Sequence, residues 1–184
     1  MKTKMLLLAT VFLPALSFAN CALSTGGWAG GASLDGPTTC TGAETDSVSV
    51  NGPLTITNTT VKTVSVNGPL NATNAQIGSA NVQGPVTLTN TKIKNLSITG
   101  TLTATGGGIK MLNILGVAKL NQMKAQNIVV AGGDSVLSSQ PVLYLNQTTV
   151  YGNITFSQVQ NGIVYVSGGS KVMGTVSGGK IENQ

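Results

Sequence analysis

Residues 48–63 read VSVNGPLTITNTTVKT and residues 64–79 read VSVNGPLNATNAQIGS, so one pattern returns after sixteen residues. The glycine of this unit keeps the same spacing further along the chain. It recurs as Gly52, Gly68, Gly84, Gly100, Gly116 and Gly132. Self-similarity at a fixed period is typical of repeat architectures. The repeat therefore determines which fold classes are open to the chain.

Apolar and polar residues alternate within each unit, which is the period of a β-strand. The apolar positions of the first unit are Val48, Val50, Leu54, Ile56 and Val61. The alternation breaks at residues 51–53 and 58–59, and Gly and Pro at such a break indicate a corner. At the second corner, Asn58, Asn74 and Asn90 recur with the repeat, and we expect an internal ladder of side-chain amides there.

A single sixteen-residue unit cannot bury its own apolar side, whereas stacked copies can. We therefore predict an all-β fold, a single-stranded parallel β-solenoid with sixteen-residue coils about 4.8 Å apart. Residues 48–184 would hold about eight coils. The alternative is an antiparallel sandwich, which predicts hairpins between unlike strands and not one fixed glycine spacing.

The regular spacing is interrupted after Gly132. Gly152 and Gly168 are again sixteen residues apart, and residues 154–156 (ITF) match residues 54–56 (LTI). This pattern predicts about four extra residues in an inserted loop at about 133–141, which would bulge out at a corner. The last coils are expected to be irregular.

The N-terminus has the features of a secretory signal peptide over residues 1–19. Lys2 and Lys4 precede an apolar run over residues 5–13, and Ser17-Phe18-Ala19 ends the segment with small residues at the cleavage positions. The run is too short to span a bilayer, so we expect no transmembrane anchor and secretion to the periplasm, the cell surface or the medium. Lipidation of Cys21 is a weaker alternative.

Cys21 and Cys40 are the only cysteines of the chain. In an oxidising compartment such a pair most often forms a structural disulfide. Neither thiol has the Cys-x-x-Cys spacing or the neighbouring charge that would activate it for redox chemistry. We therefore predict a small Gly-rich, disulfide-tied cap over residues 20–47, ahead of a solenoid that begins at residue 48.

Composition argues against catalysis. Among 184 residues only 8% are charged, and neither His nor Arg is present. Without His no conventional triad can form, and a glycosidase needs two carboxylates on either side of one bond. The five acids do not pair on one face of adjacent coils; they are Asp35, Glu44, Asp46, Asp134 and Glu182. We expect no catalytic residue, no metal site and no cofactor.

One outward face is an array of Thr-x-Thr pairs on successive coils, broken at Asn71. Its threonines are Thr55, Thr57, Thr73, Thr87, Thr89, Thr103 and Thr105. The array resembles the ice-binding faces of solenoid antifreeze proteins, and that resemblance implies ice binding. The alternative is that Thr simply favours exposed strand positions.

A second outward face is basic, and no acid occurs between residues 47 and 133. Its lysines are Lys62, Lys92, Lys94, Lys110 and Lys124. Like charges in one column repel each other, so a bound polyanion would stabilise them. We name acidic polysaccharide or a cell-envelope glycolipid as candidate partners, and no sequence-specific nucleic acid, because paired aromatics and Arg are lacking. Lysines that prevent self-association or aid solubility are the alternative.

In its repeat pattern the chain loosely resembles bacterial secreted parallel β-helix proteins, of the adhesin and bactofilin types. That resemblance implies a structural or adhesive protein of the cell surface or extracellular matrix, which assembles into homo-oligomers or fibres. Polyanion binding and ice binding are the two other functional hypotheses. All three describe a protein that is not an enzyme.

Overall fold

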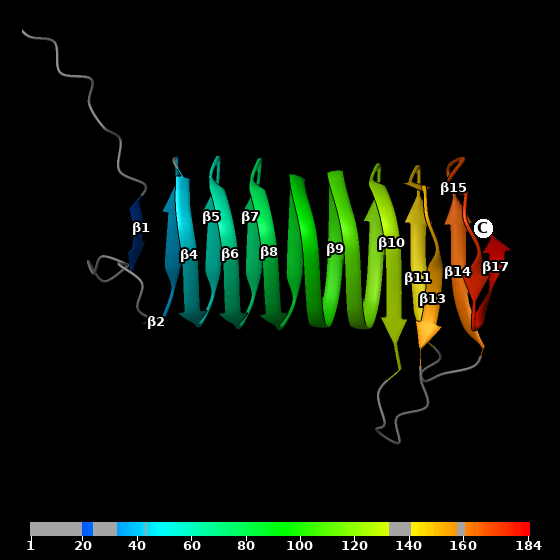
Figure 1. Cartoon of the computed structure of the whole chain (residues 1–184), viewed down its shortest axis with the longest axis horizontal. Coiled ribbons are helices and arrows are strands. Elements are labelled where there is room, and N and C mark those ends of the chain that lie inside the picture. The colour runs from blue at the N-terminus through cyan, green and yellow to red at the C-terminus, as the bar shows by residue number, and fades with distance from the viewer. Residues whose placement is uncertain (1–19, 24–32, 43, 133–140, 158–160) are drawn as a thin grey trace, which may run out of the picture.

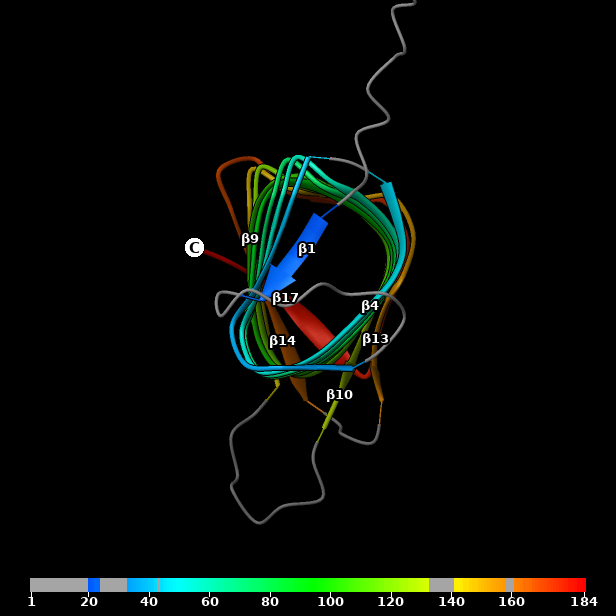
Figure 2. The same cartoon turned by 90° about the vertical axis from the view of Figure 1, so that its left-hand side faces the viewer.

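The computed structural model describes residues 20–23, 33–42, 44–132, 141–157 and 161–184. Over these residues the chain winds into about nine stacked turns of a parallel β-solenoid (Figure 1). Viewed along the axis, successive turns lie over one another around a closed ring (Figure 2). The predicted all-β parallel solenoid is thereby confirmed.

The strands follow chain order along the solenoid axis. They are β1 (Asn20–Leu23), β2 (Ser33–Asp35), β3 (Thr38–Thr41), β4 (Glu44–Asn51), β5 (Leu54–Thr57), β6 (Thr60–Asn67), β7 (Leu70–Thr73), β8 (Gln76–Gln83), β9 (Val86–Asn121), β10 (Lys124–Ala131), β11 (Val142–Asn146), β12 (Thr149–Val150), β13 (Ile154–Ser157), β14 (Gly162–Ser167), β15 (Lys171–Val172), β16 (Val176–Ser177) and β17 (Gly179–Asn183). From β2 to β8, each coil pairs in parallel with the next at a separation of sixteen residues, as Leu34, Val50 and Val66 do.

The apolar positions of the repeat form one continuous core along the axis. The predicted inward residues are buried in coil after coil; Leu54, Ile56 and Leu70, for example, have no exposed side-chain surface. Because every second residue of a strand faces the same side, the residues between them face solvent. Each outward position of the repeat therefore forms a straight row on the surface.

The glycine column is needed for close stacking of the coils. Gly84 has φ +147°, and a Cβ atom there would lie 2.6 Å from the carbonyl oxygen of Gly68. The same contact recurs one coil earlier, between Gly68 and Gly52. Glycine is thus required at this corner both for its backbone conformation and for the space above the preceding coil.

Asn58, Asn74 and Asn90 adopt φ values of +51°, +51° and +50° at the second corner, a left-handed conformation that Asn tolerates better than most residues. Their side chains are exposed, so the expected internal amide ladder is wrong. An amide ladder occurs at the glycine corner instead, where Asn67 Nδ2 donates to Asn51 Oδ1 at 3.1 Å.

Buried threonines complete the second corner from the inside. Thr91, with no exposed surface, donates its hydroxyl to the carbonyl oxygens of Ala72 (3.1 Å) and Thr89 (3.0 Å). Thr59 donates in the same way to the carbonyl oxygen of Thr57 at 2.8 Å. These hydrogen bonds satisfy the buried threonine hydroxyls at the corner.

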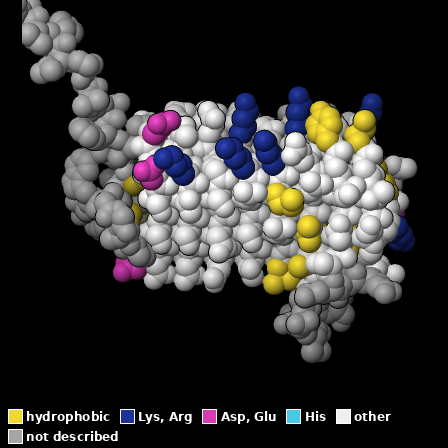
Figure 3. All heavy atoms as spheres, in the orientation of Figure 1, with side chains coloured by type: hydrophobic (Ala, Val, Ile, Leu, Met, Phe, Trp, Pro, Cys, Tyr) yellow, Lys and Arg dark blue, Asp and Glu magenta, His cyan; other side chains and the backbone are white. Residues whose placement is uncertain are grey.

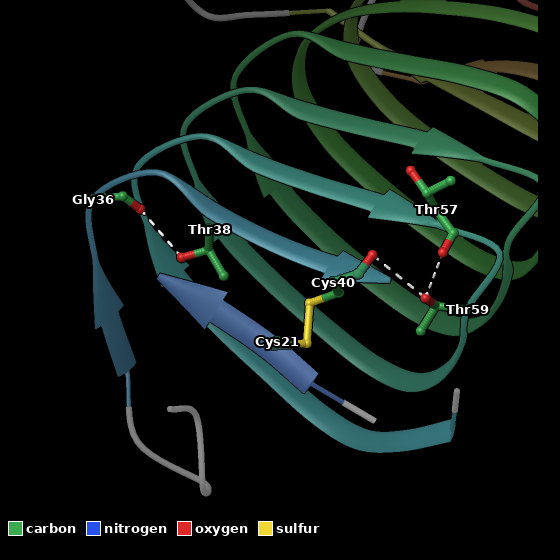
Figure 4. The surroundings of a disulfide bond; sticks show 6 residues. All are labelled: Cys21, Gly36, Thr38, Cys40, Thr57 and Thr59. Atoms are coloured by element: carbon green, nitrogen blue, oxygen red, sulfur yellow. Dashed lines mark hydrogen bonds between the residues drawn. A yellow bond between two sulfur atoms is a disulfide. The ribbon is translucent and has the colours of Figure 1, made fainter. Parts of the chain in front are cut away.

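The disulfide closes the N-terminal end of the solenoid, as predicted (Figure 4). β1 pairs antiparallel with β3, Cys21 lies opposite Cys40, and their Cα atoms are 4.0 Å apart. The parallel ladder already begins at Ser33, because β2 pairs with β4 and β3 with β5. It therefore includes part of the segment 20–47 that was expected to form a cap. The signal-peptide residues 1–19 and the Gly-rich residues 24–32 lie outside the described residues.

The register after Gly132 differs from the expectation. Leu143 pairs with Ala118, a separation of 25 residues, so nine more residues than one regular coil lie between them. Most of the expected loop, residues 133–140, lies outside the described residues. Ile154 pairs with Ile128 and thus occupies the repeat position of Val48, so its match with Leu54 was wrong. Both positions begin an apolar-polar-apolar triplet, which is why the local pattern did not distinguish them.

Candidate functional site

Most lysines of the described residues gather along one side of the solenoid (Figure 3). They belong to two outward rows, which together we call the lysine face. The first row contains Glu44, Thr60, Gln76, Lys92, Gly108, Lys124, Thr149 and Lys171. The second row lies two residues further along each coil and contains Asp46, Lys62, Gly78, Lys94, Lys110, Gln126, Tyr151 and Met173. The repeat thus brings all five predicted lysines to one surface.

A groove of about 790 Å³ lies on the lysine face, and its lining extends from Thr60 in β6 to Tyr151 after β12. Gly78, Gly107 and Gly108 also line it. The lining residues belong to consecutive coils. The groove therefore follows the solenoid axis over several coils, which is a shape suited to an extended ligand.

Lys62 differs electrostatically from the other lysines of the face. Its Nζ lies 2.6 Å from Asp46 Oδ1, and both side chains are largely exposed. The hydrogen bond to Asp46, followed by the attraction of the Asp46 and Glu44 carboxylates, raises the pKa of Lys62 above its ordinary value. The acids at the start of the two rows thus neutralise the N-terminal end of the face.

The positive charge is uncompensated further along the axis. Over the described residues, Lys92, Lys94, Lys110 and Lys124 have no ion pair, and no carboxylate follows Asp46 in either row. Lys94 and Lys110 occupy adjacent coils of one row, which the strand spacing places about 4.8 Å apart at the backbone. These four lysines repel one another, with no counter-ion in the part of the chain that the structure describes.

Two members of the face were missed in the sequence. Lys171 pairs with Thr149 and so belongs to the first row, and Tyr151 lies in the second row with 54% of its surface exposed. Their sequence separations from Lys124 are irregular because of the extra residues after Gly132. The pairing of β12 with β10 and with β15 shows that both residues lie on the lysine face.

The Thr-x-Thr array lies on another wall of the solenoid, and its seven predicted threonines all face outward. It is one coil longer than expected, because Thr39 pairs with Thr55 and Thr41 with Thr57. It ends toward the C-terminus at Lys119, whose Nζ lies 5.6 Å from the centroid of the Tyr144 ring. Tyr144 in turn stacks on Tyr165, with 5.3 Å between ring centroids.

Three further features bear on function besides the two surfaces: groups that could bind a metal, helices that could span a membrane, and the disulfide. Over the described residues there is no group of three or more His, Cys, Asp and Glu side chains that could hold a metal ion. Within the same ranges, no helix is long and apolar enough to cross a membrane. The Cys21–Cys40 disulfide indicates a non-reducing compartment.

No protein-family model matches the sequence, and no curated protein and no solved structure matches it either. The parallel β-solenoid fold alone does not specify an activity, because function depends on the sites that a fold carries. The lysine face and the Thr-x-Thr array are therefore the two surfaces from which a function can be inferred.

Proposed function

We propose that this protein is an exported, non-enzymatic binding protein of the cell surface or extracellular matrix, which holds an extended acidic polymer along its lysine face. The observation that supports this best is the uncompensated charge of Lys92, Lys94, Lys110 and Lys124 along a groove of about 790 Å³. A linear polyanion in that groove would contact lysines from several coils at once. By fixing such a polymer to a rigid solenoid, the protein would serve a structural and adhesive role.

The expected affinity comes from several weak contacts. One exposed ion pair contributes only about 0.2–1 kcal/mol, so no single lysine would dominate binding. The repulsion between Lys94 and Lys110 would be relieved when a polyanion lies over both, and counter-ions would be released at the same time. Binding should therefore be multivalent and should weaken steeply as the salt concentration rises.

The triple variant Lys92→Gln, Lys94→Gln, Lys110→Gln tests this proposal. We expect it to bind heparin, used here as a generic polyanion, about tenfold more weakly than the wild type in low salt, because three pairs of about 0.2–1 kcal/mol each are lost. Its dissociation constant should also depend less on salt concentration. Titration calorimetry at several salt concentrations measures both effects.

Lys62→Gln is the matched control, because Asp46 already neutralises Lys62 on the same face. It should change the affinity for heparin less than twofold. Equal affinities for the wild type and the triple variant, or no heparin binding by the wild type, would contradict the proposal. Circular dichroism of each variant verifies that the solenoid is intact, so that lost binding is not lost folding.

Ice binding is a second candidate, favoured by the extension of the Thr-x-Thr array to Thr39 and Thr41. Nine of the ten positions on five coils are now Thr, at a coil spacing of about 4.8 Å. On this hypothesis, Thr87→Leu with Thr89→Leu should abolish thermal hysteresis, whereas Ser97→Leu on another wall should leave it unchanged. Absence of hysteresis in the wild-type protein would eliminate the hypothesis.

A further inference from the structure

Tyr151 belongs to the coil that lies between two lysines of the lysine face. Its coil carries no lysine in the first row, where Thr149 stands, but the preceding coil carries Lys124 and the following coil carries Lys171. Thr149 pairs in register with both lysines, so each is one coil away along the axis. At the usual strand spacing the two lysines are therefore about 9.6 Å apart at the backbone, with the Tyr151 coil midway.

The ring of Tyr151 is available for contact with a ligand. The residue is 54% exposed and lines the groove. Tyr144 and Tyr165 stack on each other, which covers one face of each ring, whereas Tyr151 has no aromatic partner among the described residues. An exposed aromatic face offers an apolar, polarisable platform whose polar hydroxyl remains at its edge.

We propose that Lys124, Tyr151 and Lys171 form a subsite for three consecutive units of an acidic polysaccharide, an uncharged sugar over Tyr151 and an acidic sugar on either side. This inference rests on the proposed binding of an acidic polymer. The C–H face of a pyranose ring suits the Tyr151 ring, and the two flanking carboxylates would pair with Lys124 and Lys171. Two pyranose rings of an extended chain advance by about the distance between these lysines.

Other acidic polymers fit this subsite less well. Polyphosphate has charge but no ring to lie on Tyr151. A duplex nucleic acid carries one phosphate per strand about every 3.4 Å of helix axis, a denser row of charge than the two lysines present. A polysaccharide with a carboxylate on every sugar would place one carboxylate beside Tyr151, where Thr149 supplies no countercharge. Desolvating that charge without a partner costs binding energy.

Substitutions at Tyr151 test the subsite. The probes are hyaluronan oligosaccharides, in which acidic and uncharged sugars alternate, and polyphosphate of similar charge. We expect Tyr151→Ala to weaken hyaluronan binding about tenfold and to leave polyphosphate binding unchanged. Tyr151→Phe, which keeps the ring, should retain hyaluronan binding within about twofold. Equal effects of Tyr151→Ala on both polymers, or no effect on either, would overturn the subsite.

Thr149→Lys tests the alternation of charge. The new lysine would face the middle sugar, so we expect tighter binding of oligogalacturonate, which carries a carboxylate on every sugar, by about threefold or more. Binding of hyaluronan should change less. A larger gain for hyaluronan would contradict the inference. If the wild-type protein bound neither polysaccharide nor polyphosphate, the proposed function itself would fail, and that result is distinct from failure of the subsite alone.

Discussion

Gly84→Ala is expected to destabilise the solenoid by about 4 kcal/mol. A non-glycine residue at φ +147° is strained, which costs about 1–3 kcal/mol, and the new Cβ would lie 2.6 Å from the carbonyl oxygen of Gly68. The neighbouring coil cannot move away easily, because its own glycine is stacked on Gly52. Overpacking of this kind costs about 1–3 kcal/mol more. Urea denaturation followed by circular dichroism gives the change in the free energy of unfolding.

Gly36→Ala separates the two causes. Gly36 begins the same column with φ +104°, but a Cβ atom there would meet no atom within 4 Å. Only the conformational cost should remain, so Gly36→Ala should be less destabilising than Gly84→Ala by about 1–3 kcal/mol. If both substitutions cost the same, close stacking is not the reason for the glycine column.

Removal of the disulfide by Cys21→Ala with Cys40→Ala should destabilise the protein by roughly 3 kcal/mol, since the bond closes a loop of 19 residues in the unfolded chain. Both cysteines are buried, Cys40 at 1% exposure, and within the described ranges β1 pairs with β3 alone. We therefore expect β1 to separate from β3 before the central coils open. Hydrogen exchange would show faster exchange in β3 and unchanged exchange in β10.

The reductant dithiothreitol supplies the control for this experiment. It should lower the stability of the wild type toward that of the double variant and should have no effect on the variant itself. A further loss of stability in the variant would show that reductant acts elsewhere. Equal acceleration of exchange in β3 and β10 would contradict end-first opening and would indicate that the solenoid unfolds as one unit.

The fold could be predicted because one short pattern specifies almost everything about a coil. The glycine at position 52 and its repeats mark one corner, and the apolar residues at positions 48, 50, 54, 56 and 61 become the core of every coil. Stacking then follows, since only neighbouring copies can cover these side chains. The conformation of Asn58 was not predicted, because a left-handed corner and an internal amide ladder use the same residue type.

The register of the last coils could not be predicted from the sequence, for a physical reason. Ile154 and Leu54 both start an alternating triplet, and alternation specifies which side a residue faces but not which wall of the coil it lies on. The wall is determined by hydrogen bonding to the coil below, and Ile154 pairs with Ile128. Without that pairing, nine extra residues after Ala118 could not be distinguished from four.

The residues of the candidate site could be predicted where the coils are regular, and not where the register changes. Lys94 and Lys110 lie in the regular coils, and the repeat placed them correctly on one face. The partner of Lys62 was missed because Asp46 had been assigned to a cap, although it lies sixteen residues earlier and one coil below. Tyr151 and Lys171 follow the irregular segment, so their place on the face depends on the structure.

The ladder also uncouples distance on the surface from distance along the chain. Lys124 and Thr149 are 25 residues apart and Thr149 and Lys171 are 22 apart, yet each pair is separated by one strand spacing. A loop at a corner can therefore lengthen or shorten while the pitch presented to a ligand stays constant. Divergent relatives of this protein should be aligned coil by coil. Two chains with different residue spacings along the sequence can present binding groups to a polymer at the same distance along the axis.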